Sequence, residues 1–157
     1  MTAAKESRLH YALAGFIIFV FVQSLFYKFT GSPETHYIFV EKLDPWSASL
    51  GFPGLFAPGG IFSATVVGSA ELVASTILAI GTLSTMRVLQ GLGAMLAMAV
   101  ISGAIFFHLF TPLGVSVRNA DGSFDGGQLF ALACGVWVTS AVLIWLRREM
   151  LLALIRR

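Results

Sequence analysis

The fold is decided by the stretch VLQGLGAMLAMAVISGAIFFHLFTPL, residues 88–113, which has no charged side chain unless His108 is protonated. A helix needs about 20 apolar residues to cross roughly 30 Å of hydrocarbon. Three further runs of the same character cover residues 9–27, 61–83 and 129–146. Only helices and closed barrels satisfy the backbone inside lipid, and these runs lack the alternation of barrel strands.

These four runs predict an all-α integral membrane protein with a single transmembrane domain over residues 1–157. We expect an antiparallel bundle of four transmembrane helices at about 9–29, 61–83, 88–111 and 128–147. The composition agrees, because 57% of the residues are apolar and only 11% are charged. A soluble domain carries about 25% charged residues. The net charge of +2 is explained by membrane topology and gives no reason to expect nucleic-acid binding.

The basic residues predict which way the chain crosses the membrane. With four crossings, seven basic residues fall on the side of the termini (Lys5, Arg8, Arg87, Arg147, Arg148, Arg156 and Arg157). Three fall on the other side (Lys28, Lys42 and Arg118). The positive-inside rule therefore places both termini in the cytoplasm. The first run is longer than the apolar core of a signal peptide and has no cleavage pattern after it, so we interpret it as a retained helix.

The two connections on the outer side differ from the inner one. The inner connection, Ser84–Arg87, is short and predicts a tight helical hairpin. The outer loop over residues 30–60 is long, with a turn at its start and a short helical piece through His36–Leu43. Its second half, Pro45–Gly60, is apolar but rich in helix breakers, so we expect it to lie partly in the membrane interface with Trp46 as an anchor.

Glu71 is the first candidate for function, since it is the only acid in any of the apolar runs. A charge inside the hydrocarbon of a membrane is energetically costly, and intramembrane acids usually face the bundle interior. Ala64, Gly68, Glu71, Ser75, Ala79 and Thr82 recur at spacings of three and four, which predicts a small, polar face on this helix. The alternative is a protonated Glu71 that only pins two helices together.

His108 and Lys28 are the partners that we expect for Glu71. His108 shares a face with Gly93, Ala97 and Ala104 and so is predicted to point inward. Lys28 ends the first run, where its side chain can extend outward or fold back over the bundle. A Lys–Glu–His cluster would exchange protons or orient a ligand. The alternative is an outward-extending lysine and a histidine at headgroup level.

The other polar residues give weaker indications of function. Gln23, inside the first run, is a further candidate, though an interhelical hydrogen bond explains it equally well. Cys134 is alone, which excludes a disulfide within this chain. The stretch Asp121–Gly126 resembles the start of a calcium loop but lacks the later Glu, so a plain turn is expected. The sequence predicts no metal site and no covalently bound cofactor.

Several motifs together resemble the DoxX-like family of small bacterial membrane proteins. They are Phe26–Phe29 at the end of the first helix, Gly68–Leu72 in the second, Ala104–His108 in the third and Asp125–Gly127 before the fourth. The resemblance extends from about Tyr11 to Trp145. The sequence departs from the family at Leu25, where a glycine is expected, and in its longer outer loop.

The resemblance implies a four-helix bundle in the bacterial cytoplasmic (inner) membrane, with Lys28, Glu71 and His108 as the family's polar residues. Some members are associated with quinone-linked oxidoreductases, including a thiosulfate:quinone enzyme of archaea. It therefore implies a quinone as ligand and oxidoreductase subunits as partners. Two alternatives stay open: a non-catalytic accessory subunit, and a binder or carrier of a small hydrophobic molecule, for which transport would require a homo-oligomer.

Overall fold

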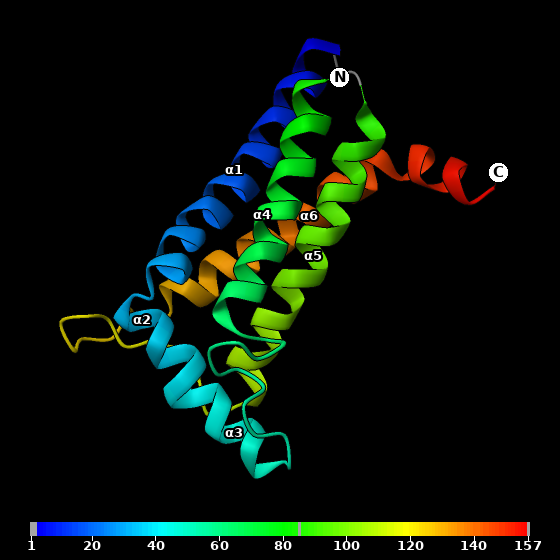
Figure 1. The fold of residues 1–157 in the computed structure, drawn as a ribbon. Helices are drawn as coiled ribbons and strands as arrows, with labels where there is room; N and C mark the ends of the chain where they lie inside the picture. Colours follow the sequence, from blue (N-terminus) through cyan, green and yellow to red (C-terminus); the bar gives the residue numbers. More distant parts are fainter. Residues whose placement is uncertain (1–2, 85, 157) are drawn as a thin grey trace.

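Four long helices form the body of the protein, which is described by a computed structural model covering residues 3–84 and 86–156. They are α1 (Ala3–Thr30), α4 (Ala64–Leu83), α5 (Arg87–Phe110) and α6 (Gln128–Ile155), and they run antiparallel in chain order (Figure 1). Each contains a segment long and apolar enough to cross a membrane. The predicted all-α, four-helix architecture is confirmed, and the chain is a multi-pass integral membrane protein.

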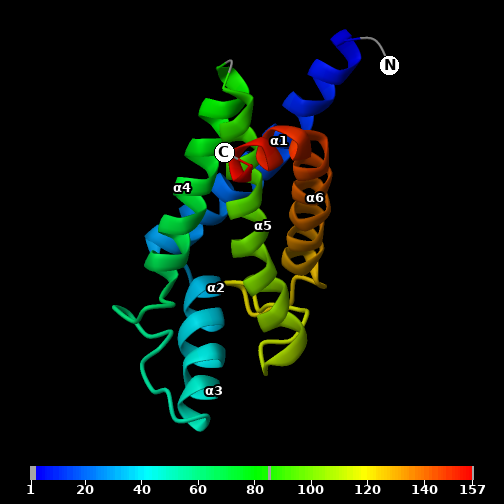
Figure 2. The same ribbon diagram turned by 90° about the vertical axis from the view of Figure 1, so that its right-hand side faces the viewer.

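The helices pack as a closed ring. Helix α1 packs against α4 and α6, and α5 packs against the same two helices from the other side. One hydrophobic core runs through the bundle and includes Ile17, Phe21, Leu78, Ala97 and Leu143. Helix α1 crosses the others obliquely (Figure 2), which accommodates its length of 28 residues.

Helices α4 and α5 approach each other closely at two glycines. A Cβ at Gly81 would lie 2.1 Å from the backbone nitrogen of Gln90, and one at Gly93 would lie 2.7 Å from that of Leu78. No side chain fits at these distances, so glycine is required at both positions. Small residues of this kind let membrane helices gain van der Waals contact where lipid gives no hydrophobic drive to associate.

The ends of the helices differ from the sequence prediction in three places. Helix α1 begins at Ala3 rather than at residue 9, and α4 begins at Ala64 rather than at residue 61. Helix α6 continues to Ile155, well beyond the expected end at residue 147. Hydropathy alone underestimates helix length wherever charged residues continue a helix past the hydrocarbon. The tight turn expected at Ser84–Arg87 includes residue 85, which lies outside the described residues.

We call the end of the bundle that carries the N-terminus and the α4–α5 connection the inner end, following the predicted orientation (Figure 1). The C-terminal part of α6 turns aside there from the direction of its first part (Figure 2). Of the seven basic residues expected on this side, Arg157 lies outside the described residues.

The opposite end carries an outer cap, formed by residues 31–63 and 111–127. Its helical part is continuous and consists of α2 (Pro33–His36), η1 (Tyr37–Leu43) and α3 (Asp44–Ser49). A second hydrophobic cluster fills the cap and contains Tyr37, Phe39, Leu43, Phe56, Leu113 and Val117. The predicted helical piece at 36–43 is therefore part of a longer helix, and η1 within it is a π-helix.

Pro45 and Asp44 shape the cap. Proline has no N–H, and its ring clashes with the carbonyl four residues before it, which explains a widened helix immediately before Pro45. The Asp44 carboxylate accepts hydrogen bonds from the backbone N–H groups of Phe56 and Ala57, at 3.0 and 3.1 Å. Trp46, expected to be an interface anchor, is half-buried and packs against Phe56 and Phe107. It is therefore part of the second cluster.

Asp125 ties the second loop of the cap to the start of α6. Its Oδ1 accepts hydrogen bonds from Ser116, Val117 and Gly127, and its Oδ2 accepts one from Leu129. Burial raises the pKa of the Asp125 carboxyl, but these hydrogen bonds outweigh burial, so its pKa lies below the usual value. The turn predicted at Asp121–Gly126 is confirmed, with a capping carboxylate at its end.

We expect Asp125→Ala to lower the stability of the protein at neutral pH by about 1–3 kcal/mol, because hydrogen bonds to the charged carboxylate are lost. A lowered folded-state pKa contributes stability above the unfolded pKa, about 3.9, which is lost as the pH falls through the folded value. The difference between wild type and variant in thermal unfolding, measured in detergent, should therefore shrink below about pH 4. Asp121→Ala is the control, because that carboxylate binds only Ser123. Equal losses in both variants would contradict the capping role.

Candidate functional site: an ion pair buried between two membrane helices

The site is built from the outer ends of α1 and α4. Lys28 lies two residues before the end of α1, and Glu71 lies seven residues after the start of α4. At 1.5 Å per residue, Glu71 is about 10 Å from the outer end of its helix. The later start of α4 thus brings Glu71 closer to the depth of Lys28 than the sequence prediction had placed it.

Lys28 and Glu71 form a two-pronged ion pair. The Lys28 ammonium donates to both carboxylate oxygens of Glu71, at 3.0 and 3.1 Å. It also donates to the hydroxyl of Ser24, one turn earlier on α1. The Lys28 side chain is 14% exposed and that of Glu71 only 6%. All three N–H donors of the Lys28 ammonium are therefore used, and both charged groups are largely buried.

The packing around the pair explains the departure at position 25. A Cβ at Gly68 would lie 3.2 Å from the Phe29 ring and 3.5 Å from the Leu25 side chain. The buried Leu25 thus covers Gly68, one turn before Glu71 on α4. Leu25, where the family resemblance led us to expect a glycine, therefore packs on a glycine of α4. The predicted small face of α4 is confirmed, since Gly68, Glu71 and Ser75 are all buried.

The pair also lies at the boundary between the two hydrophobic clusters. On α4, Val67 packs against the cluster of the outer cap, whereas Ala74 belongs to the core of the bundle. Glu71 lies between these two positions in the helix. The ion pair is therefore the polar layer between the membrane bundle and its outer cap.

His108 points inward, as predicted, but its partner is a different one. It is buried, and its Nδ1 lies 2.6 Å from the carbonyl oxygen of Gly114. Its ring meets Phe130 edge-on at 5.6 Å between centroids. No hydrogen bond or ion pair joins His108 to Lys28 or Glu71 among the residues that the structure describes. His108 therefore fastens the loop after α5, while Lys28 and Glu71 form a site of two.

Gln23 takes no part in the site. It is exposed on the face of α1 that also carries the exposed Phe19 and Phe26. Within residues 3–84 and 86–156, no hydrogen bond from its side chain holds a neighbouring helix. The interhelical hydrogen bond that the sequence suggested is therefore not formed between the described residues.

Two further polar groupings were not anticipated from the sequence. At the inner end, the buried Arg147 donates to Gln90, which in turn donates to Thr82. On the outer cap, Arg118 pairs with Glu41 at 2.9 Å and lies over the Tyr37 ring. The sequence held one sign of the first grouping: Gln90 is a lone amide near the start of an otherwise apolar helix. The second joins residues 77 positions apart in sequence, for which no local pattern exists.

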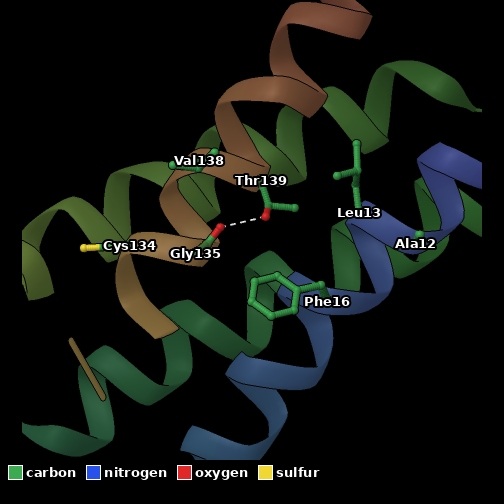
Figure 3. Close-up of a pocket in the computed structure, with 7 residues that line it drawn as sticks. All are labelled: Ala12, Leu13, Phe16, Cys134, Gly135, Val138 and Thr139. Atoms are coloured by element: carbon green, nitrogen blue, oxygen red, sulfur yellow. Dashed lines mark hydrogen bonds between the residues drawn. The ribbon is translucent and has the colours of Figure 1, made fainter. Parts of the chain in front are cut away.

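A cleft of about 540 Å³ opens between α1 and α6. Its lining is almost entirely apolar and consists of Ala12, Leu13, Phe16, Cys134, Gly135, Val138 and Thr139 (Figure 3). The Thr139 hydroxyl drawn there donates to the carbonyl oxygen of Gly135 in its own helix (Figure 3). The cleft thus offers mainly apolar contact to a ligand.

Comparison with known proteins adds no further information about the site. No protein-family model, no curated protein and no solved structure matches this chain.

We expect Lys28→Met alone to destabilise the protein by about 3–5 kcal/mol, because it leaves the buried Glu71 charge without a partner. The double variant Lys28→Met/Glu71→Leu should recover most of that loss, since an apolar pair of similar volume needs no desolvation. Thermal unfolding in detergent measures both.

Glu149→Leu is the control for this pair. It removes an ion pair with Arg148 in which Glu149 is 81% exposed, and we expect a change below about 1 kcal/mol. A double variant as unstable as Lys28→Met would show that the pair does not act as a unit.

Proposed function

We propose that this integral membrane protein takes part in quinone-linked redox chemistry, with Lys28 and Glu71 as the groups that meet the quinone head group. The observation that carries the proposal is the ion pair itself, buried between two membrane helices near their outer ends. The resemblance to the DoxX-like family supports the same chemistry, and with it oxidoreductase subunits as partners in the bacterial inner membrane.

Stability alone does not explain the pair. Removing two charges from water costs several kcal/mol per ion, and well-packed apolar residues of the same volume are often equally stable. Charged residues inside membrane proteins usually serve a substrate, an ion or a proton. A Lys–Glu pair buried between two membrane helices is therefore better explained by a ligand that arrives through the membrane.

A quinone suits these two side chains. Its carbonyl oxygens accept hydrogen bonds, and its reduction to the quinol takes up two electrons and two protons. We propose that the Lys28 ammonium donates to one carbonyl oxygen in place of its hydrogen bond to Ser24. Glu71 would accept and release the protons, and the electrons would come from the oxidoreductase partner. On this proposal the chain contributes the head-group site and the partner contributes the redox centre.

The cleft between α1 and α6 favours a second candidate function, the binding of a small hydrophobic molecule. Its volume of about 540 Å³ lies within the usual range of ligand pockets. Neither Lys28 nor Glu71 lines it, so such a molecule would bind apart from the ion pair. Binding there would depend on Phe16 and the small residues around Gly135 rather than on charge.

Native mass spectrometry of the detergent-purified protein, after incubation with a lipid extract, tests both candidates. We expect wild type and Glu149→Gln to retain a species of quinone or quinol mass, and Glu71→Gln to retain about tenfold less, because the carboxylate that would accept a hydrogen bond from a quinol hydroxyl is replaced by a neutral amide. Thermal unfolding of each variant shows that the comparison is made between folded proteins.

Two results would contradict the proposal. Equal retention by Glu71→Gln together with loss in Gly135→Leu would move the ligand to the cleft and favour the second candidate. A folded wild type that retains no such species would favour the remaining alternative, an accessory subunit in which the ion pair only holds α1 against α4.

A further inference from the structure

The second buried cation of the protein, Arg147, lies at the inner end of the bundle. It is 9% exposed, and its Nε donates to the Oε1 of Gln90 at 2.7 Å. The Nε2 of Gln90 donates to the Thr82 hydroxyl at 2.9 Å. This chain of hydrogen bonds joins α6, α5 and α4 and holds the guanidinium against the first turn of α5.

Arg147 has no anionic partner among the side chains that the structure describes. Among the described residues, the ion pairs are formed by Lys28, His36, Arg118 and Arg148, and none involves Arg147. Gln90 is uncharged, and Arg87, the first residue of α5, adds a second positive charge at the inner end. A buried cation without an anion is unfavourable by several kcal/mol, so an anion bound beside Arg147 would stabilise the arrangement.

The start of α5 also favours a bound anion. The helix begins at Arg87, and no side chain caps its first turn. The unpaired N–H groups of a helix start, together with the helix dipole, attract negative charge. Arg147 is hydrogen-bonded to Gln90 of that first turn, so both features act on the same region.

Neighbouring residues place this region at the level of the lipid headgroups. Trp145, which precedes Arg147 by two residues, is 61% exposed, and the Arg148 guanidinium lies 4.5 Å from its ring centre. Exposed tryptophans gather at the membrane–water interface. Beyond it, the turned-aside end of α6 (Figure 2) carries the exposed Leu152 and Leu154, which suits a segment lying on the membrane surface.

We propose that Arg147 and Arg87 bind the phosphate group of an anionic lipid in the leaflet at the inner end. The guanidinium of Arg147 has two terminal nitrogens without a hydrogen-bond partner in the described chain, and they match two phosphate oxygens. Arg87, exposed at the start of α5, closes the site from the solvent side. This inference does not depend on the proposed function of Lys28 and Glu71.

The test compares retention of dioleoyl phosphatidylglycerol and dioleoyl phosphatidylcholine by the full-length protein in native mass spectrometry. We expect wild type and Arg156→Gln, a control that removes an exposed charge from the same end, to retain phosphatidylglycerol preferentially. Retention should fall about tenfold in Arg147→Gln and severalfold in Arg87→Gln. If Arg147→Gln fails to fold, the retention measured for Arg87→Gln decides the test, because replacing the exposed Arg87 side chain should leave the fold intact.

A third arm with inorganic phosphate separates the two sources of the anion. Millimolar phosphate that leaves the bound phosphatidylglycerol in place supports a lipid site, whereas full displacement would assign the site to free phosphate and overturn the lipid proposal. An equal loss in Arg156→Gln, or no preference for phosphatidylglycerol in wild type, would overturn the proposal as a whole.

Discussion

Hydrocarbon offers no hydrogen-bond partner, so each charge inside the membrane bundle needs an opposite charge at a fixed place. Glu71 meets this requirement through Lys28, with both carboxylate oxygens bound and the ammonium completed by Ser24. The pair fixes the depth of α1 relative to α4, because sliding either helix by one turn, about 5.4 Å, would separate the charges. Because Gly68 has no side chain, Leu25 and Phe29 pack directly against α4 at this position.

The two ends of the bundle solve the same problem in different ways. Near the outer end the cation and the anion both come from the chain, and they separate the core of the bundle from the cluster in the cap. At the inner end, the hydrogen-bond partner of Arg147 among the described residues is the neutral Gln90. In the outer site Lys28 and Glu71 satisfy each other, so a ligand binds there only by replacing one of their hydrogen bonds. At the inner end, the proposed anionic lipid would provide the negative charge for Arg147.

Much of this arrangement was predictable from hydropathy and spacing. The four crossings, the small face around Glu71 and the inward direction of His108 follow from helical periodicity and the cost of charge in lipid. The partner of His108 did not follow, because the Gly114 carbonyl belongs to a loop whose path depends on tertiary contacts. The C-terminal extension of α6 was missed because Arg147 and Arg148 resemble the charged flank of a membrane helix. The continuous helix of the cap was missed because Pro45 resembles a helix breaker. Pro45 instead lies in the first turn of α3, where its missing N–H is tolerated.

The central claim is that Glu71 is an ionised carboxylate held by Lys28 inside the membrane. Infrared difference spectroscopy, comparing wild type with Glu71→Gln in lipid bilayers at neutral pH, tests it most directly. We expect the substitution to remove carboxylate stretching bands from the wild-type spectrum. A protonated carbonyl band for Glu71 already present in the wild type would contradict the ion pair, and with it the site built on it.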